Sequence, residues 1–212
     1  PALEEARRRN IPVLTEIELG YRLCEGVPVA ITGTNGKTTT TSLTGQMFRD
    51  AGRKNYVVGN IGIPYTAYAL DATPEYTMVT EISSYQLQCI EQFHPRVAAM
   101  LNITPDHLDR HGGMEGYIEA KRRIFMNQTT DDFAVLNYDD PTVRAMAEQI
   151  KAKTVFFSRK EELKEGVFVK DGELIFKYGA VSAVVCRIEN IYIKGPHNLE
   201  NAMAATAVAM LM

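Results

Sequence analysis

Short apolar runs alternate along this chain with longer stretches whose apolar residues recur every three or four positions. The short runs are typical of strands buried inside a sheet, and the longer stretches are typical of helices packed against one. This alternation predicts an α/β fold with a mostly parallel sheet flanked by helices on both faces. The expected strands cover residues 11–14, 27–32, 55–59, 76–83, 96–103, 132–140 and 154–158. The expected helices cover residues 16–25, 37–52, 114–128 and a segment from Pro141, and in the second of these Leu43, Met47 and Phe48 share a face.

The pattern changes over residues 166–186, which leave no room for a helix. Asp171-Gly172 lies there between two short β-type runs, a strong signal for a hairpin with a type I′ turn. We therefore expect a small antiparallel β appendage near residues 166–190, followed by a final helix. Neither end of the chain carries a clear helix start or stop signal, so we expect a piece of a longer protein.

Composition narrows the class of protein. The chain has 212 residues, of which 45% are hydrophobic and 23% charged, and its net charge is −3, which does not suit a nucleic-acid footprint. The longest apolar run, "AMAATAVAMLM", is too short to span a bilayer. The odd number and wide spacing of Cys24, Cys89 and Cys186 indicate reduced thiols. We expect a cytoplasmic monomer that binds neither nucleic acid nor membrane.

A glycine-rich loop, "ITGTNGKTTTTS", follows the strand at 27–32 and opens a helix. The common phosphate loop has four residues between its first glycine and Gly-Lys-Ser/Thr. Here Ile31 takes that first position and the nearest glycine is Gly33. A shorter loop can still point backbone N–H groups and a helix N-terminus at a phosphate. Lys37 would supply charge to the β- and γ-phosphates and Thr38 a ligand for Mg²⁺, although a plain tight turn is the alternative.

Acidic and polar groups follow two further strands. Glu81 lies near the end of "YTMVTEIS", where it is either a magnesium ligand or a carboxylate facing water. The loop after the next strand concentrates groups of the metal-ligand type, and loops at the carboxyl ends of parallel strands hold ligands. These groups are Asn102, Thr104, Asp106, His107, Asp109 and His111.

The local sequence gives weaker evidence of function for the remaining candidate residues. Lys121, beside two arginines, is typical of a solvated helix face. The segment "NIGIP" at 60–64 is either a substrate loop or a turn. His197, Asn198 and Asn201 open the last helix at spacings that share one face, so they either meet a ligand or cap the helix.

Five motifs in one order resemble the middle, ATP-binding domain of the Mur ligases, the ADP-forming amide ligases of peptidoglycan precursor synthesis. They are "GTNGKTT", "EISSYQLQ", "NITPDHLDRH", "YIEAKRRIF" and "GPHNLENAMAA". The second is most similar to the D-glutamate-adding branch of the family. The resemblance implies that residues 1–15 are the tail of an N-terminal UDP-binding domain or a linker. It implies that residues 16–212 are the central domain, without the C-terminal domain that binds the amino acid.

The resemblance also implies roles for individual residues. The phosphates of ATP would be wrapped by Gly33, Thr34, Asn35, Gly36, Lys37, Thr38 and Thr39. Two Mg²⁺ ions would be held by Thr38, Glu81, His107 and Lys121, the last being a lysine that carries a carbamate in the family. The catalytic residues would be Lys37, His107 and Lys121, and those on the substrate side Asn60, Ser84 and Gln86. The adenine side would be formed by His197, Asn198 and Asn201.

The activity that the resemblance implies is the joining of D-glutamate to UDP-MurNAc-L-Ala through an acyl phosphate, with release of ADP and phosphate. We expect these 212 residues alone to bind Mg-ATP weakly and not to ligate. The alternatives are a P-loop phosphotransferase, a non-catalytic ATP-binding relative, and a ligase similar to folylpolyglutamate synthase.

Overall fold

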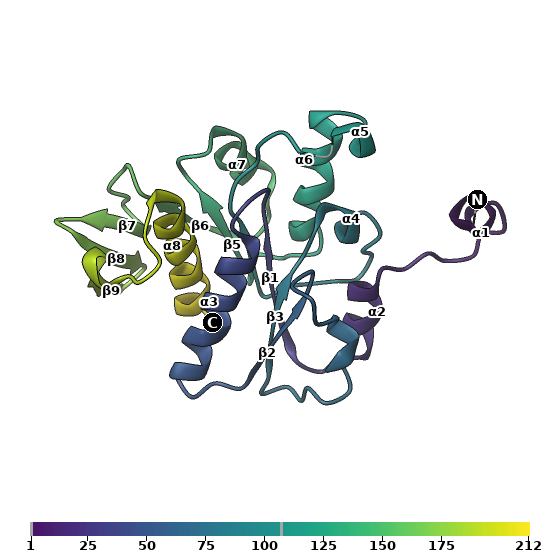
Figure 1. Cartoon of the computed structure of the whole chain (residues 1–212), viewed down its shortest axis with the longest axis horizontal. Helices are drawn as coiled ribbons and strands as arrows, with labels where there is room; N and C mark the ends of the chain where they lie inside the picture. Colours follow the sequence, from purple (N-terminus) through teal and green to yellow (C-terminus); the bar gives the residue numbers. More distant parts are fainter. Residues whose placement is uncertain (1, 107) are drawn as a thin grey trace.

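One sheet of nine strands runs through the molecule (Figure 1). The computed structural model describes residues 2–106 and 108–212. The strands are β1 Val27–Thr32, β2 Asn55–Gly59, β3 Thr77–Glu81, β4 Val97–Met100, β5 Phe133–Asn137, β6 Lys153–Ser158, β7 Gly166–Lys170, β8 Glu173–Tyr178 and β9 Val181–Arg187. The α-helices are α1 Ala2–Arg8, α2 Glu16–Leu23, α3 Lys37–Asp50, α4 Ser84–Leu87, α5 Leu108–His111, α6 Met114–Arg122, α7 Pro141–Ala145 and α8 Pro196–Leu211. Short 3₁₀ turns are η1 Tyr65–Ala67, η2 Arg123–Phe125, η3 Met146–Gln149 and η4 Ile188–Asn190.

The strand order is β2-β3-β1-β4-β5-β6-β7-β8-β9, and the pairs from β2 to β7 are parallel. The chain first fills the sheet on one side of β1 and then crosses to the other side at β4. The sheet therefore has a topological switch point beside β1, and open α/β sheets bind ligands at the carboxyl ends of the strands there.

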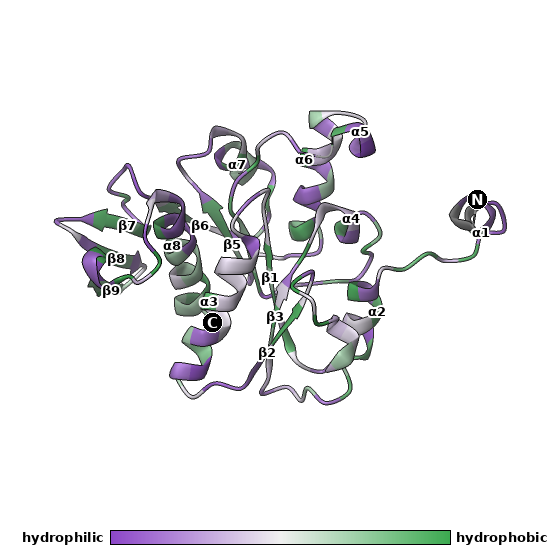
Figure 2. Ribbon diagram, viewed as in Figure 1, coloured by the Kyte–Doolittle hydropathy of each residue, from purple (hydrophilic) through white to green (hydrophobic). Residues whose placement is uncertain are grey.

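Two apolar layers cover the two faces of the sheet. Alternate residues of β1 face opposite ways, so that Ile31 packs with α3 and α8 while Ala30 packs on the side of α2, α6 and α7. The strands and α8 carry much of the hydrophobic colouring in Figure 2, and the loops at the strand ends are mainly hydrophilic. The predicted mostly parallel sheet with helices on both faces is confirmed.

The appendage expected near residues 166–190 continues this same sheet. β7 pairs parallel with β6, and β8 pairs antiparallel with β7 on one side and with β9 on the other. Asp171 and Gly172 have φ of 50° and 77°, the two positive values that a type I′ turn requires. The predicted hairpin is therefore confirmed at these two residues.

Several details differ from the sequence prediction. Residues 11–14 form no strand but an extended link to α2. Thr15 is the N-cap of that helix, and its side chain accepts a hydrogen bond from the Glu18 backbone N–H. The predicted helix at 114–128 ends as an α-helix at Arg122 and continues as η2. The buried face of α3 also differs, because Thr40, Thr41, Thr44, Gly45 and Phe48 are buried while Leu43 and Met47 are only partly so. At Gly45 a Cβ would lie 2.3 Å from a methyl group of Val57, so close packing favours small residues there.

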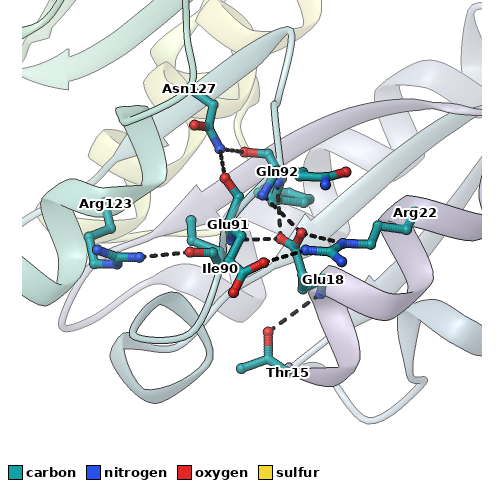
Figure 3. Close-up of polar contacts among 9 residues, drawn as sticks. Thr15, Glu18, Arg22, Ile90, Glu91, Gln92, Arg123 and Asn127 are labelled. Atoms are coloured by element: carbon teal, nitrogen blue, oxygen red, sulfur yellow. Dashed lines mark hydrogen bonds and ion pairs between the residues drawn. The ribbon is translucent and has the colours of Figure 1, made fainter. Parts of the chain in front are cut away.

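A fully buried carboxylate fastens α2 to the body of the fold. Glu18 accepts bonds from the backbone N–H groups of Glu91, Gln92 and Phe93 at 2.8–3.0 Å and from Arg22 at 2.8 Å (Figure 3). Burial acts to raise the pKa of the Glu18 carboxyl, but these donors outweigh burial and hold that pKa below its ordinary value. This network fixes α2 to the segment before β4.

The helices described here are too short or too polar to cross a membrane. All three cysteines are free thiols, as predicted, and each is half-buried.

Candidate functional site

The phosphate-type loop closes tightly against α8. Gly36 precedes the first residue of α3 with φ of 84°, a left-handed conformation that favours glycine. A Cβ on Gly36 would lie 2.2 Å from Oδ1 of Asn201, a buried residue of α8. The loop therefore needs glycine at this position both for its backbone conformation and for its contact with α8.

The loop after β4 holds the phosphate-type loop from the other side. The Asn102 amide accepts a bond from the Asn35 backbone N–H at 2.8 Å and donates to the Asn35 carbonyl at 3.1 Å. The Thr34 hydroxyl lies 3.0 Å from the backbone nitrogen of Thr104 and 3.1 Å from the hydroxyl of Tyr117 on α6. These contacts fasten the phosphate-type loop to the loop after β4 and to α6.

Two lysine amines converge on this loop. Lys37 Nζ donates to the carbonyls of Gly33 at 3.0 Å and Thr34 at 2.7 Å. Lys121 Nζ donates to the same Gly33 carbonyl at 2.8 Å and lies 4.9 Å from the centre of the Tyr117 ring. Lys121 is only 2% exposed, so it does not lie on the solvated face that its own sequence surroundings indicate.

Burial lowers the pKa of both lysines. For Lys37 the nearby carboxylates of Glu81 and Asp106 act in the opposite direction. For Lys121 burial and then the charge of Lys37 lower the pKa to about 7. A large share of the Lys121 side chain is therefore a neutral, nucleophilic amine near neutral pH.

A buried carboxylate lies at the end of β3, beside β1. Glu81 is 1% exposed, and its Oε1 accepts a bond from the Asn60 side chain at 2.8 Å. Its Oε2 is buried, and no donor among the described residues bonds to it. An orphaned buried carboxylate oxygen is costly, and a cation would offset that cost, so this residue fits a magnesium site.

Among the described residues, no further acidic side chains join Glu81 to complete a set of ligands for a metal ion. Within residues 2–106 and 108–212, no group of three His, Cys, Asp or Glu side chains could hold an ion. Thr38, the second residue of α3, is exposed at the mouth of the loop. A Mg²⁺ ion here would take further ligands from phosphate oxygens and water, as is usual at nucleotide sites. His107 lies outside the described residues.

A cavity of about 570 Å³ adjoins the loop, within the range of small-molecule sites. It separates the loop after β4 from the start of α8. Its walls include Gly36, Thr39, Asn102, His197, Asn198 and Asn201. Asn198 and Asn201 are bonded to each other at 3.2 Å, and the Asn198 amide also donates to the Lys194 carbonyl just before the helix. The structure thus brings the three residues of α8 to the same cavity as the loop.

Ser84 and Gln86 have structural partners on α4 and α5. Gln86 forms a capping box with Ser83 at the start of α4. Ser84 Oγ lies 3.0 Å from Nε2 of His111, whose Nδ1 lies 3.1 Å from the Gln88 amide. Neither residue lines the 570 Å³ cavity.

Sequence reasoning missed several residues of the site. Tyr117 braces Thr34, and its place four residues before Lys121 on one helix is a signal that could have found it. Glu200 and Phe157 line the cavity. Phe157 gives no local signal, because it becomes a wall only when β6 joins the sheet two strands from β4.

The chain matches a known family model. The model described as "Mur ligase middle domain" covers residues 31–209. A "UDP-N-acetylmuramoylalanine--D-glutamate ligase" of Alkaliphilus metalliredigens (strain QYMF) is 50% identical over all of this chain, which covers 47% of that relative. The relative of the same name from Alkaliphilus oremlandii (strain OhILAs) is 52% identical over 99% of this chain and 46% of its own length. The chain thus spans about half the length of these relatives.

Solved structures share the fold. A UDP-N-acetylmuramoyl-L-alanyl-D-glutamate--2,6-diaminopimelate ligase superimposes with a TM-score of 0.67 at 22% identity, over 97% of this chain and 45% of that one. A MurF ligase from Thermotoga maritima in complex with ADP gives 0.63 at 21% identity, over 92% of this chain and 48% of that one.

Proposed function

This chain belongs to the Mur ligase family, and from that membership we propose that it is the ATP-binding part of a ligase that adds D-glutamate to UDP-MurNAc-L-alanine. The name shared by the relatives at about half identity supports this choice of substrates. The substrates are small molecules, and we propose that the protein acts on them as a monomer in the cytoplasm.

The observation that carries the proposal is the convergence of Lys37, Lys121 and an unbonded Glu81 oxygen at one end of the parallel sheet. The cationic Lys37 and the backbone N–H groups at the start of α3 suit the triphosphate of ATP. The adjoining cavity suits the nucleoside, with His197, Asn198 and Asn201 on the adenine side. Gly33 to Thr39 would then surround the phosphates.

We infer that Thr38 and Glu81 hold a Mg²⁺ ion and that Lys121 and His107 contribute to a second one. When bound, these ions neutralise negative charge on the phosphates during transfer. Asn60 orients the Glu81 carboxylate through its side-chain bond and also remains our candidate for a substrate contact. Ser84 and Gln86 stay predictions for the substrate side.

Lys121 becomes a ligand for a cation only after chemical change, because an amine at this site is a donor. We propose that its neutral form attacks CO₂. The new bond joins Nζ to carbon, one proton leaves the nitrogen, and the product is a carbamate with a carboxylate end. The lowered pKa of Lys121 favours this reaction, because only the neutral amine has a free electron pair.

The proposed reaction has two steps. An alanyl carboxylate oxygen attacks the γ-phosphorus of ATP, the bond to the β-phosphate oxygen breaks, and ADP and an acyl phosphate form. The D-glutamate nitrogen then attacks the acyl carbon, phosphate leaves, and the amine loses a proton. Lys37 stabilises the charge of the transferring group, and the hydrogen-bonded loop keeps that group in line.

The test is ADP release by the full-length protein with UDP-MurNAc-L-Ala and each of several amino acids, with and without Lys121→Ala. We expect release that depends on D-glutamate and falls by at least ~100-fold in the variant. Release that responds to neither the amino acid nor the substitution would contradict the proposal. These 212 residues alone are expected to bind Mg-ATP without ligating.

A further inference from the structure

An ion pair joins the end of β6 to the start of α8, at the wall of the nucleotide cavity. Arg159 Nε lies 3.1 Å from Glu200 Oε1, and the two side chains are 33% and 24% exposed. Glu200 lines the cavity of about 570 Å³. Arg159 lines a neighbouring cavity of about 320 Å³ with Ile191 and Leu199. The pair therefore forms part of the partition between the two cavities.

The arginine end of this pair is fixed to the sheet. The Asp139 carboxylate, in the loop after β5, accepts a bond from the Arg159 backbone N–H at 2.9 Å. Its other oxygen accepts one from the Ser158 hydroxyl at 2.6 Å. Arg159 thus presents its guanidinium from a backbone that two neighbouring strands hold in place.

The start of α8 lies directly beside the phosphate loop. Gly195, which precedes the helix, has φ of 102° and makes no side-chain cap. One residue after Glu200, Asn201 lies against Gly36 of the phosphate loop. Any shift of this end of α8 would move Asn201 away from Gly36 and move His197 within the cavity.

The geometry points to Arg159 as a positioning residue of the nucleotide site. It acts through Glu200, holding the first turns of α8 where Asn201 supports the phosphate loop and where the helix lines the cavity. This role rests on the proposed function, because it assumes that the cavity takes ATP. Nothing requires Arg159 or Glu200 to touch the nucleotide.

The direction in which Glu200→Gln changes nucleotide affinity distinguishes this positioning role from repulsion of the phosphates by the Glu200 charge. A carboxylate that merely lay near the phosphates would repel them, so its removal would tighten nucleotide binding. If Glu200 instead positions α8, the change Glu200→Gln weakens binding. We expect Kd for Mg-ADP to rise about fivefold in Glu200→Gln and in Arg159→Ala, the upper end for an exposed or half-buried ion pair.

The experiment is calorimetric titration of Mg-ADP into the full-length protein and its variants, with thermal unfolding of each. Arg159→Ala combined with Glu200→Gln should bind as weakly as either single variant, because the two residues act as one unit; independent effects would multiply to about 25-fold. KM for UDP-MurNAc-L-Ala should stay within about twofold. Lys170→Ala removes an exposed ion pair between the end of β7 and Glu162, in the connection before that strand, and is the matched control, expected to bind normally.

The outcomes are distinct. If the unsubstituted protein does not bind Mg-ADP, the proposed function fails. If it binds and Glu200→Gln binds equally well or more tightly, the positioning role of Arg159 is overturned. If Arg159→Ala does not fold, Glu200→Gln alone decides, because it preserves the shape of the side chain.

Discussion

Lys37 and Lys121 donate to the same atom, the carbonyl oxygen of Gly33, at 3.0 and 2.8 Å. Two ammonium groups at one acceptor repel each other, and Lys121, the more deeply buried, is the one whose pKa falls to about 7. The loop that would bind phosphate therefore has two lysine amines directed at its backbone. The deeper of the two is poised to lose its proton near neutral pH.

The low pKa of Lys121 predicts how stability depends on pH. Its pKa in the fold is about 7, below the ordinary value of 10.5, so between these pH values the unfolded chain binds the extra proton. The free energy of unfolding should therefore rise with pH across this window, by up to about 1.4 kcal/mol per pH unit from this residue. Below pH 7, Lys121 should add nothing to the pH dependence of that free energy. Urea denaturation in CO₂-free buffer measures this.

Lys121→Met isolates the contribution, because methionine fills similar space without a charge. We expect the variant to lack the part of the rise in unfolding free energy with pH that comes from Lys121. Its stability relative to the original protein should therefore be greatest near pH 6 and decline as pH rises. Lys170→Met, at an exposed position, should keep the slope. Parallel pH profiles for Lys121→Met and the original protein would refute the assignment.

Gly36 predicts a steric effect that can be separated from backbone strain. In Gly36→Ala the new Cβ meets Asn201 at 2.2 Å, whereas at Gly52, with φ of 71°, a Cβ meets nothing within 4 Å. Gly52→Ala should cost about 1–2 kcal/mol from its left-handed backbone alone. Gly36→Ala should cost more and should abolish measurable Mg-ADP binding. Adding Asn201→Gly should recover part of the stability; equal losses in the two alanine variants would contradict the contact.

The sequence predicts the features that depend on neighbours in the chain. The spacing of "GTNGKT" marks the loop, and Asp171-Gly172 marks the hairpin, because turn chemistry is local. The burial of Lys121 could not be predicted from its surroundings, since the Gly33 carbonyl that receives it lies 88 positions away. Only the resemblance of the motif indicated a role for it.

Packing also explains the wrong strand and the wrong helix face. Residues 11–14 are apolar enough for a strand, but Ile11 is 54% exposed and the segment has no partner strand among the described residues. α3 buries threonines and a glycine because α8 and β2 approach it closely. Hydrophobic periodicity records which residues are apolar, and it does not record how near the next element lies.

The hydrogen bond from Asn60 to Glu81 predicts that Asn60 affects Mg²⁺ binding indirectly, through the carboxylate that it orients. Its amide donates to one oxygen of Glu81, and no donor among the described residues bonds to the other. Asn60→Ala should raise the Mg²⁺ concentration for half-maximal ADP release by about tenfold, as for other groups that orient metal ligands. Titration of Mg²⁺ at saturating ATP in the full-length protein measures this.

Two controls accompany Asn60→Ala. Asn127→Ala removes an amide that bonds backbone carbonyls far from the loop, and its Mg²⁺ requirement should be unchanged. Because Asn60 is also a candidate for substrate contact, KM for UDP-MurNAc-L-Ala is measured in parallel. A raised KM with an unchanged Mg²⁺ requirement would assign Asn60 to the substrate and not to Glu81.

Because the Glu18 carboxylate fastens α2 to the fold, we expect that attachment to weaken when the carboxylate is replaced or protonated. Glu18→Gln puts an amide where three backbone N–H groups need acceptors, so it should lower the free energy of unfolding by about 3 kcal/mol at pH 7. Glu91→Gln, which removes the exposed partner of Arg22, should cost less than about 1 kcal/mol.

The pH dependence gives the Glu18 network a second, independent test. Because the fold lowers the pKa of Glu18 below 4.5, its stabilisation is complete above that pH and is lost as pH falls through the lower, folded value. Stability measured by urea denaturation from pH 7 to pH 3 should therefore fall more steeply in the original protein than in Glu18→Gln. The two curves should converge in acid, where Glu18 is protonated and, like glutamine, can no longer satisfy all its donors. Curves that stay about 3 kcal/mol apart down to pH 3 would show that the carboxylate charge is not what fastens α2 to the segment before β4.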